Sequence, residues 1–292
     1  MKNPQKTVEA NGLTVRVITP HSGLEAFRYA MASLITDWPT ARALAWRMFV
    51  RDTKASYRHS FLGYVWLLLP ALANTLVWVF LNNQKVVNID SGAAPYPLFV
   101  FCGTVLWTAF NTSLIGAMGV VQTAGGTLSK VNFPHEALIL NEFGKSLLNT
   151  LATAIFVVPF LLIFPVPLGW HSLLFPVGIL ATMIFGTAVG LLTVPITALF
   201  SDLSRAIHLG MRFAFFLTPV IFPVPAGGWG RTLFLCNPVT HLLVTSRSWL
   251  IGGESMMLSG FLVVTATSLV LLFVGVIAFK VSLPHIIERL SS

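Results

Sequence analysis

Six long apolar stretches constrain the fold of this chain more than any other feature of its sequence. A helix needs roughly 20 mostly apolar residues to cross the hydrocarbon core of a bilayer. Because 55% of the 292 residues are hydrophobic, only 10% are charged and the mean hydropathy is +0.80, an ordinary soluble domain is excluded. The sequence therefore predicts an all-α polytopic membrane protein with six transmembrane helices. We expect these spans at about 61–81, 96–122, 146–165, 173–200, 206–223 and 258–279.

The segment at 224–253, between the fifth and sixth stretches, is too broken to span and too apolar for an ordinary loop. Several glycines and Pro238 interrupt it. Non-helical backbone at membrane depth needs partners within the protein or a cavity that it lines. We therefore expect short re-entrant or interfacial helices here, one on either side of Asn237-Pro238.

Basic residues indicate the orientation of the chain. With both termini inside, fifteen Lys and Arg side chains fall on the inner side, and only Lys85, Arg231 and Arg247 fall outside. Cytoplasmic segments carry an excess of Lys and Arg, so the sequence predicts an N-in, C-in topology. The net charge of +8 then lies near anionic headgroups, and no nucleic-acid partner is needed to explain it.

An amphipathic segment precedes the first apolar stretch. Residues 1–37 lack the apolar core of a secretory signal, so we expect a cytoplasmic N-terminal extension. Over 38–58, apolar residues recur at helical spacing and alternate with Arg42, Arg47 and Arg51 on the other face. Such a helix lies in the membrane interface. It serves either as a plain anchor or as a docking surface, ahead of a six-helix transmembrane domain at 59–292.

The chain lacks the residues that chemistry at a membrane requires. No G-x-x-x-x-G-K-[ST] motif is present to cradle ATP phosphates, and the seven histidines and two cysteines are scattered without metal-ligand spacing. We therefore expect no catalytic residue, no metal and no cofactor in this chain. Residues 61–84, 96–129, 146–170 and 258–279 contain no Asp, Glu, Lys or Arg, which argues against an ion-coupled carrier and against a lone flippase. A membrane glycosyltransferase or ligase is disfavoured because too few acidic residues fall on outer loops.

Four segments follow one another in a characteristic order and spacing. They are RDTKASYRHSFLGYVWLLLPAL (51–72), LSKVNFPHEALIL (128–140), FSDLSRAIHLGMRFAFFLTPVIFP (200–223) and CNPVTHLLVTSRSWL (236–250). Together they resemble type-2 ABC transporter permeases of the polysaccharide, O-antigen and teichoic-acid export family. The likeness covers about residues 38–290, whereas residues 1–36 extend beyond the usual short lead of the family.

The resemblance implies the membrane (permease) subunit of an ATP-driven ABC exporter. Its cargo would be an undecaprenyl-linked polysaccharide, such as O-antigen, capsule or a related glycan, moved across the bacterial inner membrane. Two copies of the chain would form the pore as a homodimer, and two copies of a cytoplasmic ABC ATPase would bind ATP and Mg. A teichoic acid exporter and a type-2 exporter of another lipid or small molecule are the alternatives.

The resemblance also implies candidate residues at the cytoplasmic side. Clustered cations and a glycine at the start of the first span suit a lipid diphosphate. That group is Arg51, Lys54, Arg58 and Gly63. The alternative for its three cations is that they set topology and contact lipid headgroups. The loop before the third span would couple to the ATPase through Gly125, Gly126, Lys130, Asn132, Pro134, His135 and Glu136.

Two further groups of candidates lie in the apolar stretches and the broken segment. Flat aromatic rings in a pore would allow sugars to slide, although such rings commonly pack against lipid. The aromatic candidates are Trp66, Trp78, Phe80, Phe99, Trp107, Phe110, Phe215 and Phe216. By the resemblance, the broken segment would form a periplasmic gate. The gate candidates are Pro219, Pro223, Trp229, Asn237, Pro238 and Arg247.

Overall fold

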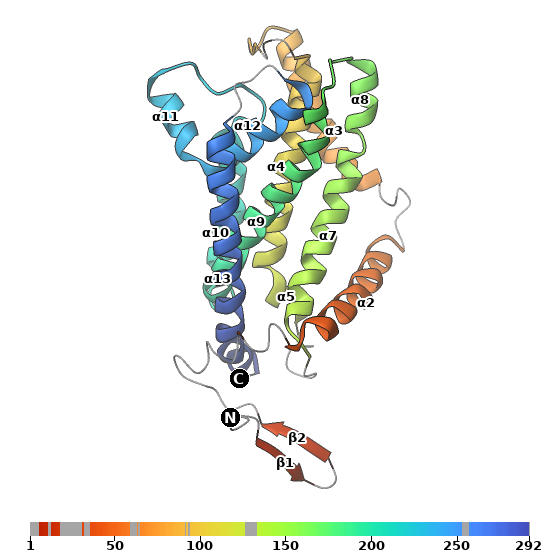
Figure 1. Cartoon of the computed structure of the whole chain (residues 1–292), viewed down its shortest axis with the longest axis vertical. Helices are drawn as coiled ribbons and strands as arrows, with labels where there is room; N and C mark the ends of the chain where they lie inside the picture. Colours follow the sequence, from red (N-terminus) through yellow and green to blue (C-terminus); the bar gives the residue numbers. More distant parts are fainter. Residues whose placement is uncertain are drawn as a thin grey trace.

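The computed structural model describes residues 6–10, 13–17, 31, 36–58, 63, 65–90, 92, 94–125, 133–252 and 257–291. Long helices stand side by side in one bundle, with short helices at the end drawn uppermost in Figure 1 and one more, Val120–Ala124, toward the lower end. The long helices are α2 (Trp38–Tyr57), α3 (Val65–Asn83), α4 (Tyr96–Met118), α7 (Glu136–Ala154), α9 (Phe175–Thr197), α10 (Ser201–Phe216) and α13 (Leu258–Ser291). The short helices are α5 (Val120–Ala124), α8 (Val157–Ile163), η1 (Trp170–Leu174), α11 (Gly228–Cys236) and α12 (Pro238–Ile251).

Five helical segments within the described ranges are long and apolar enough to cross a membrane. They are Val65–Asn83, Tyr96–Met118, Glu136–Ile163, Trp170–Thr197 and Leu258–Glu288. This confirms a helical membrane protein with at least these candidate spans. The predicted fifth span, 206–223, falls on α10, which has 16 residues and ends at Phe216 before the turn around Pro219. The count of six spans therefore stays a prediction.

The centre of the bundle is formed by α4 and α9. In the most apolar window of α4, 78% of residues are buried, compared with 17% in α3. Gly186 and Gly190 of α9 bring the two helices close, because a Cβ at either position would collide with the carbonyl oxygen of Phe110 or Leu114. Small residues allow this backbone approach in membrane helices, where burial of apolar surface gives little driving force. In the outer candidate spans Val65–Asn83, Glu136–Ile163 and Leu258–Glu288, only 17–22% of the most apolar window is buried, as expected of a surface that faces lipid.

A β-hairpin stands apart from the helices in Figure 1. Strands β1 (Lys6–Ala10) and β2 (Leu13–Val17) pair antiparallel, with Lys6 opposite Val17. The sequence predicts an extension at 1–37 but no strands within it. The β-branched residues of these strands favour extended backbone, and the short pattern was hidden beside the much longer apolar stretches. The all-α fold class is confirmed for the bundle, and the structure adds this hairpin.

Candidate functional site

A buried ion pair closes one end of the bundle. Nζ of Lys280, near the end of α13, donates to Oε1 of Glu136, the first residue of α7. Their side chains are only 11% and 6% exposed. A charge buried this deeply is stable only when it is paired. The pair therefore fixes the start of α7 against α13, and Val121, Ile139 and Phe279 pack in the apolar cluster beside it.

The predicted coupling loop adjoins this ion pair. Gly125 ends α5 with φ of +45°, a conformation that favours glycine. Pro134 begins the turn into α7, since its carbonyl accepts from the amide of Ala137. Burial lowers the pKa of His135, with a smaller lowering from Lys280 and an opposing effect of Glu136. The remaining candidates, Gly126, Lys130 and Asn132, lie outside the described residues.

Three of the candidate lipid-diphosphate residues, Arg51, Lys54 and Arg58, lie at the C-terminal end of α2. Arg51 pairs with Asp52 at 2.8 Å, and the second carboxylate oxygen of Asp52 accepts from Nδ2 of Asn141 on α7 at 2.9 Å. Asp52 thus ties α2 to α7 and partly neutralises Arg51. Lys54 and Arg58 are exposed, and the described part of the chain shows no ion pair for either.

Gly63, the fourth member of this group, has φ of +52°, so the backbone here strains any residue with a Cβ. The turn therefore has a local reason for glycine that does not depend on a ligand.

The candidate aromatic rings divide into buried and open ones. Phe99, Trp107 and Phe110 are buried in the core of the chain, so contact with a cargo there would require helices to separate. Phe215 bridges the two groups, because its ring lies 5.7 Å from that of Trp107 and 5.3 Å from that of Phe216. The half-buried Trp78 of α3 stands edge-on to Phe216 of α10, with centroids 6.4 Å apart. The rings that remain more than half exposed are Trp66, Phe80 and Phe216.

The opposite end of the bundle is organised around Arg247, which is the largest fully buried side chain among the described residues. Its Nη1 donates to the carbonyl oxygen of Val220 at 3.0 Å, and its guanidinium carbon lies 3.6 Å from the ring centroid of Phe99. Val220 lies in the non-helical turn after α10, where backbone carbonyls lack regular helical partners. Gly103 leaves room for this carbonyl, since a Cβ there would collide with it. The assignment of Arg247 to an outer segment stays a prediction, and the structure adds that its side chain is buried inside the protein.

Asn237 joins this turn to α12. Its Oδ1 caps the helix by accepting from the amide of Val239 at 3.0 Å, and Pro238 follows as the first helical residue. Its Nδ2 donates to Oγ1 of Thr218 at 2.9 Å and to the carbonyl of Leu217. One amide therefore fixes the end of α10 to the start of α12.

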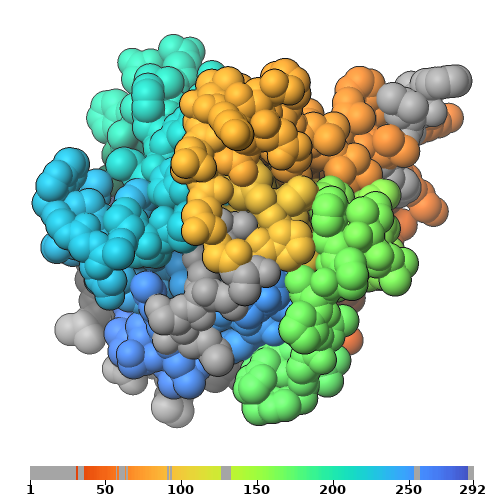
Figure 2. All heavy atoms as spheres, turned by 90° about the horizontal axis from the view of Figure 1, so that it is seen from above, coloured from red at the N-terminus to blue at the C-terminus, as the bar shows by residue number. Residues whose placement is uncertain are grey.

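Short helices α11 and α12 flank Asn237, and their re-entrant placement stays a prediction. Pro219 is buried and Pro223 is half-buried in the turn that follows α10. Trp229 on α11 is 81% exposed. Figure 2 shows this end from above, with α11 at the rim of the face.

Sequence reasoning missed three residues that organise these sites. Lys280 was counted only as a topology determinant, and neither Asp52 nor Asn141 was chosen. For Lys280 the sequence offered one signal. Lys280 stands at the end of an apolar run and Glu136 at the start of another, each as an isolated charge. Nothing in the sequence pairs these two, because they are 144 positions apart.

Membrane-length apolar helices around a buried α4–α9 centre define an integral membrane protein. Residues 43–251 match the ABC-2 type transporter family, and because this is more than half of the 292 residues, the chain belongs to that family. It is 29% identical over 225 residues to the O-antigen export system permease protein RfbA of Myxococcus xanthus, covering 75% of this chain and 84% of that protein.

Two further relatives carry similar names. The O-antigen export system permease protein RfbA of Klebsiella pneumoniae is 23% identical, over 70% of this chain and 78% of its own length. The polysialic acid transport protein KpsM of Escherichia coli is 21% identical, over 80% of this chain and 91% of its own length.

Proposed function

We propose that this chain is the membrane subunit of an ATP-driven exporter that moves undecaprenyl-linked polysaccharide across the bacterial inner membrane. The observation that carries the proposal is the family match over 43–251 together with relatives named for O-antigen export and polysialic acid transport. The undecaprenyl link rests on the motif resemblance alone. O-antigen and capsule both remain within the proposed cargo class.

The proposed assembly is a homodimer of this chain with two copies of a cytoplasmic ABC ATPase. ATP and Mg would bind to that ATPase, since this sequence has no phosphate-cradling glycine loop of its own. Both termini would face the cytoplasm, as the excess of fifteen basic residues over three supports.

The coupling step would pass from the ATPase to the 125–136 segment and then to two helices at once. Glu136 supports this route, because its buried pair with Lys280 joins the segment directly to α13. A push on the segment therefore moves α7 and α13 together. Reversing the charge of Glu136 would test folding as well as coupling, so Lys130→Glu is the cleaner variant for coupling.

The proposed gate is the region that Arg247 and Asn237 hold together. Arg247 anchors the turn after α10 to α12 and α4, and Asn237 caps α12 on the same turn. Movement of α10 would therefore carry α12 with it. Phe216 ends α10 at this turn and is exposed, so its ring, with Trp78 of α3 edge-on to it, is the best candidate for sugar contact.

Affinity purification of the full-length chain from its native host tests the assembly. We expect an ABC ATPase with a Walker A motif to co-purify and to hydrolyse ATP in the complex. Lys130→Glu should keep the complex and its ATP hydrolysis while export falls at least tenfold. Absence of any such ATPase, with the chain itself intact in the membrane, would refute the proposed energy source.

A further inference from the structure

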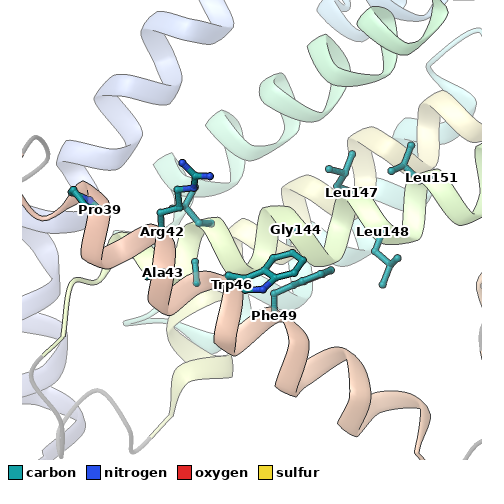
Figure 3. A pocket seen from close by; sticks show the side chains of 11 residues that line it. Pro39, Arg42, Ala43, Trp46, Phe49, Gly144, Leu147, Leu148 and Leu151 are labelled. Carbon is teal, nitrogen blue, oxygen red and sulfur yellow. The ribbon is translucent and has the colours of Figure 1, made fainter.

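An apolar groove runs between α2 and α7 at the surface of the chain (Figure 3). Trp46 and Phe49 line it from α2, and Leu147 and Leu151 line it from α7. The helices approach closely at its floor, where a Cβ at Gly144 would lie 3.2 Å from the Phe49 ring. Its volume of about 810 Å³ falls within the range of roughly 300–1,000 Å³ that ligand sites occupy.

A cation, Arg42, stands at one end of this groove. Arg42 lines it, is exposed, and forms no ion pair with any acidic side chain in the described ranges. Figure 3 shows Arg42 toward one end, with Leu147 and Leu151 toward the other. Among the described residues that line the groove, no other side chain is charged. An occupant that matches these walls is therefore anionic at one end and apolar along its length.

The length of the groove identifies the kind of apolar chain that fits. Leu140 and Leu151 both line it and are eleven residues apart on α7. At 1.5 Å per residue, this is about 16 Å of helix. One leaflet provides about half of the roughly 30 Å hydrocarbon core, so the groove matches one leaflet. Trp46, which is 66% exposed beside Arg42, suits the boundary between headgroups and acyl chains.

We propose that this groove binds one anionic membrane phospholipid, with an acyl chain between α2 and α7 and its phosphate on Arg42. This site is separate from the candidate cations Arg51, Lys54 and Arg58, and it is independent of the cargo. The bound lipid would fill the space between the two helices and so fix the angle between α2 and α7.

Native mass spectrometry of the full-length chain, titrated with phosphatidylglycerol or with phosphatidylcholine, tests this inference. We expect one tightly retained phosphatidylglycerol per chain. Arg42→Gln should weaken its retention about tenfold, which corresponds to about 1.4 kcal/mol. Arg47→Gln is the matched control, because Arg47 is exposed on the same helix and does not line the groove. Equal retention of the two lipids, or equal effects of the two substitutions, would overturn the proposal.

A photo-crosslinking residue placed at Leu148, in the groove, identifies the occupant directly. We expect an adduct with the mass of one phospholipid, lost when Ala43→Trp fills the groove. An adduct to a second copy of this chain, or to another protein, would show that the groove is a protein interface and would refute a lipid site. An unchanged lipid adduct in the filled variant would show non-specific annular lipid and would also refute it.

Discussion

Removing Lys280 leaves a buried carboxylate without its partner. In Lys280→Met, Glu136 stays in a site where its side chain is 6% exposed. Breaking a buried pair from one side costs roughly 3–5 kcal/mol, because the remaining charge loses its compensation. At roughly 2–4 °C per kcal/mol for a domain of about 150–250 residues, the apparent melting temperature should fall by at least about 6 °C.

Three further variants separate the effect of breaking the ion pair from the effect of losing the Lys280 side chain. Glu136→Gln with Lys280→Met removes both charges and should recover most of the lost stability, since a neutral pair needs little compensation. The swap Glu136→Lys with Lys280→Glu should recover part of it. Arg205→Met is the control, because Arg205 pairs with Asp202 at the surface, with side chains 80% and 91% exposed.

Fluorescence-detected melting of each full-length variant in detergent measures these shifts. If Lys280→Met melts within about 1 °C of the wild type, as Arg205→Met should, the pair does not fix α7 to α13. The proposed coupling route through Glu136 would then lose its support.

Three other outcomes follow from the contacts at the two ends of the bundle. A lysine at position 247 cannot both stack on Phe99 and reach the Val220 carbonyl, so Arg247→Lys should lose about 2 kcal/mol of stability, measured by melting. An unchanged melting temperature would mean that Arg247 does not anchor the turn. Asn237→Ala loses the cap of α12 and both hydrogen bonds that Nδ2 donates, so it should cost more than the roughly 1 kcal/mol of a cap alone. Asn237→Asp keeps the cap but loses the two Nδ2 bonds, so it should cost less than Asn237→Ala. Equal losses in the two variants would mean that the cap contributes nothing. Burial lowers the pKa of His135 and holds its ring neutral, so its contribution to stability is complete above about pH 6.5 and is lost as the pH falls below that value. The melting temperature of His135→Gln should therefore depend less on pH between about 5 and 7. An unchanged pH profile would contradict this.

The five apolar stretches that form candidate spans were visible in the sequence because each covers about twenty or more residues with no charged side chain. Their ends were less visible, and the third shows why. Its helix begins at Glu136, ten residues before the predicted start at 146, because Glu142 and Lys145 made those turns look polar. In the structure these two side chains pair with each other along α7, so they do not interrupt the helix.

The contacts within the candidate sites could not be predicted from the sequence, for a different reason. Arg247 binds a carbonyl 27 positions away and stacks on Phe99, and both partners are fixed only by the packing of α12 against α4. Charge counting assigns an arginine to one side of the membrane but does not report whether its side chain is buried, so it could not show that Arg247 is internal. The split of the aromatic rings into buried and exposed ones likewise depends on tertiary packing, which periodicity does not report.

The most direct test of the central claim is the fate of the glycan when this chain is deleted from its host. We predict that surface polysaccharide is lost and that lipid-linked polymer accumulates inside the inner membrane. Wild-type chain should restore export, whereas chain paired with an ATPase mutated in its Walker A lysine should not. Normal surface polysaccharide in the deletion strain, with no lipid-linked polymer inside, would contradict the account.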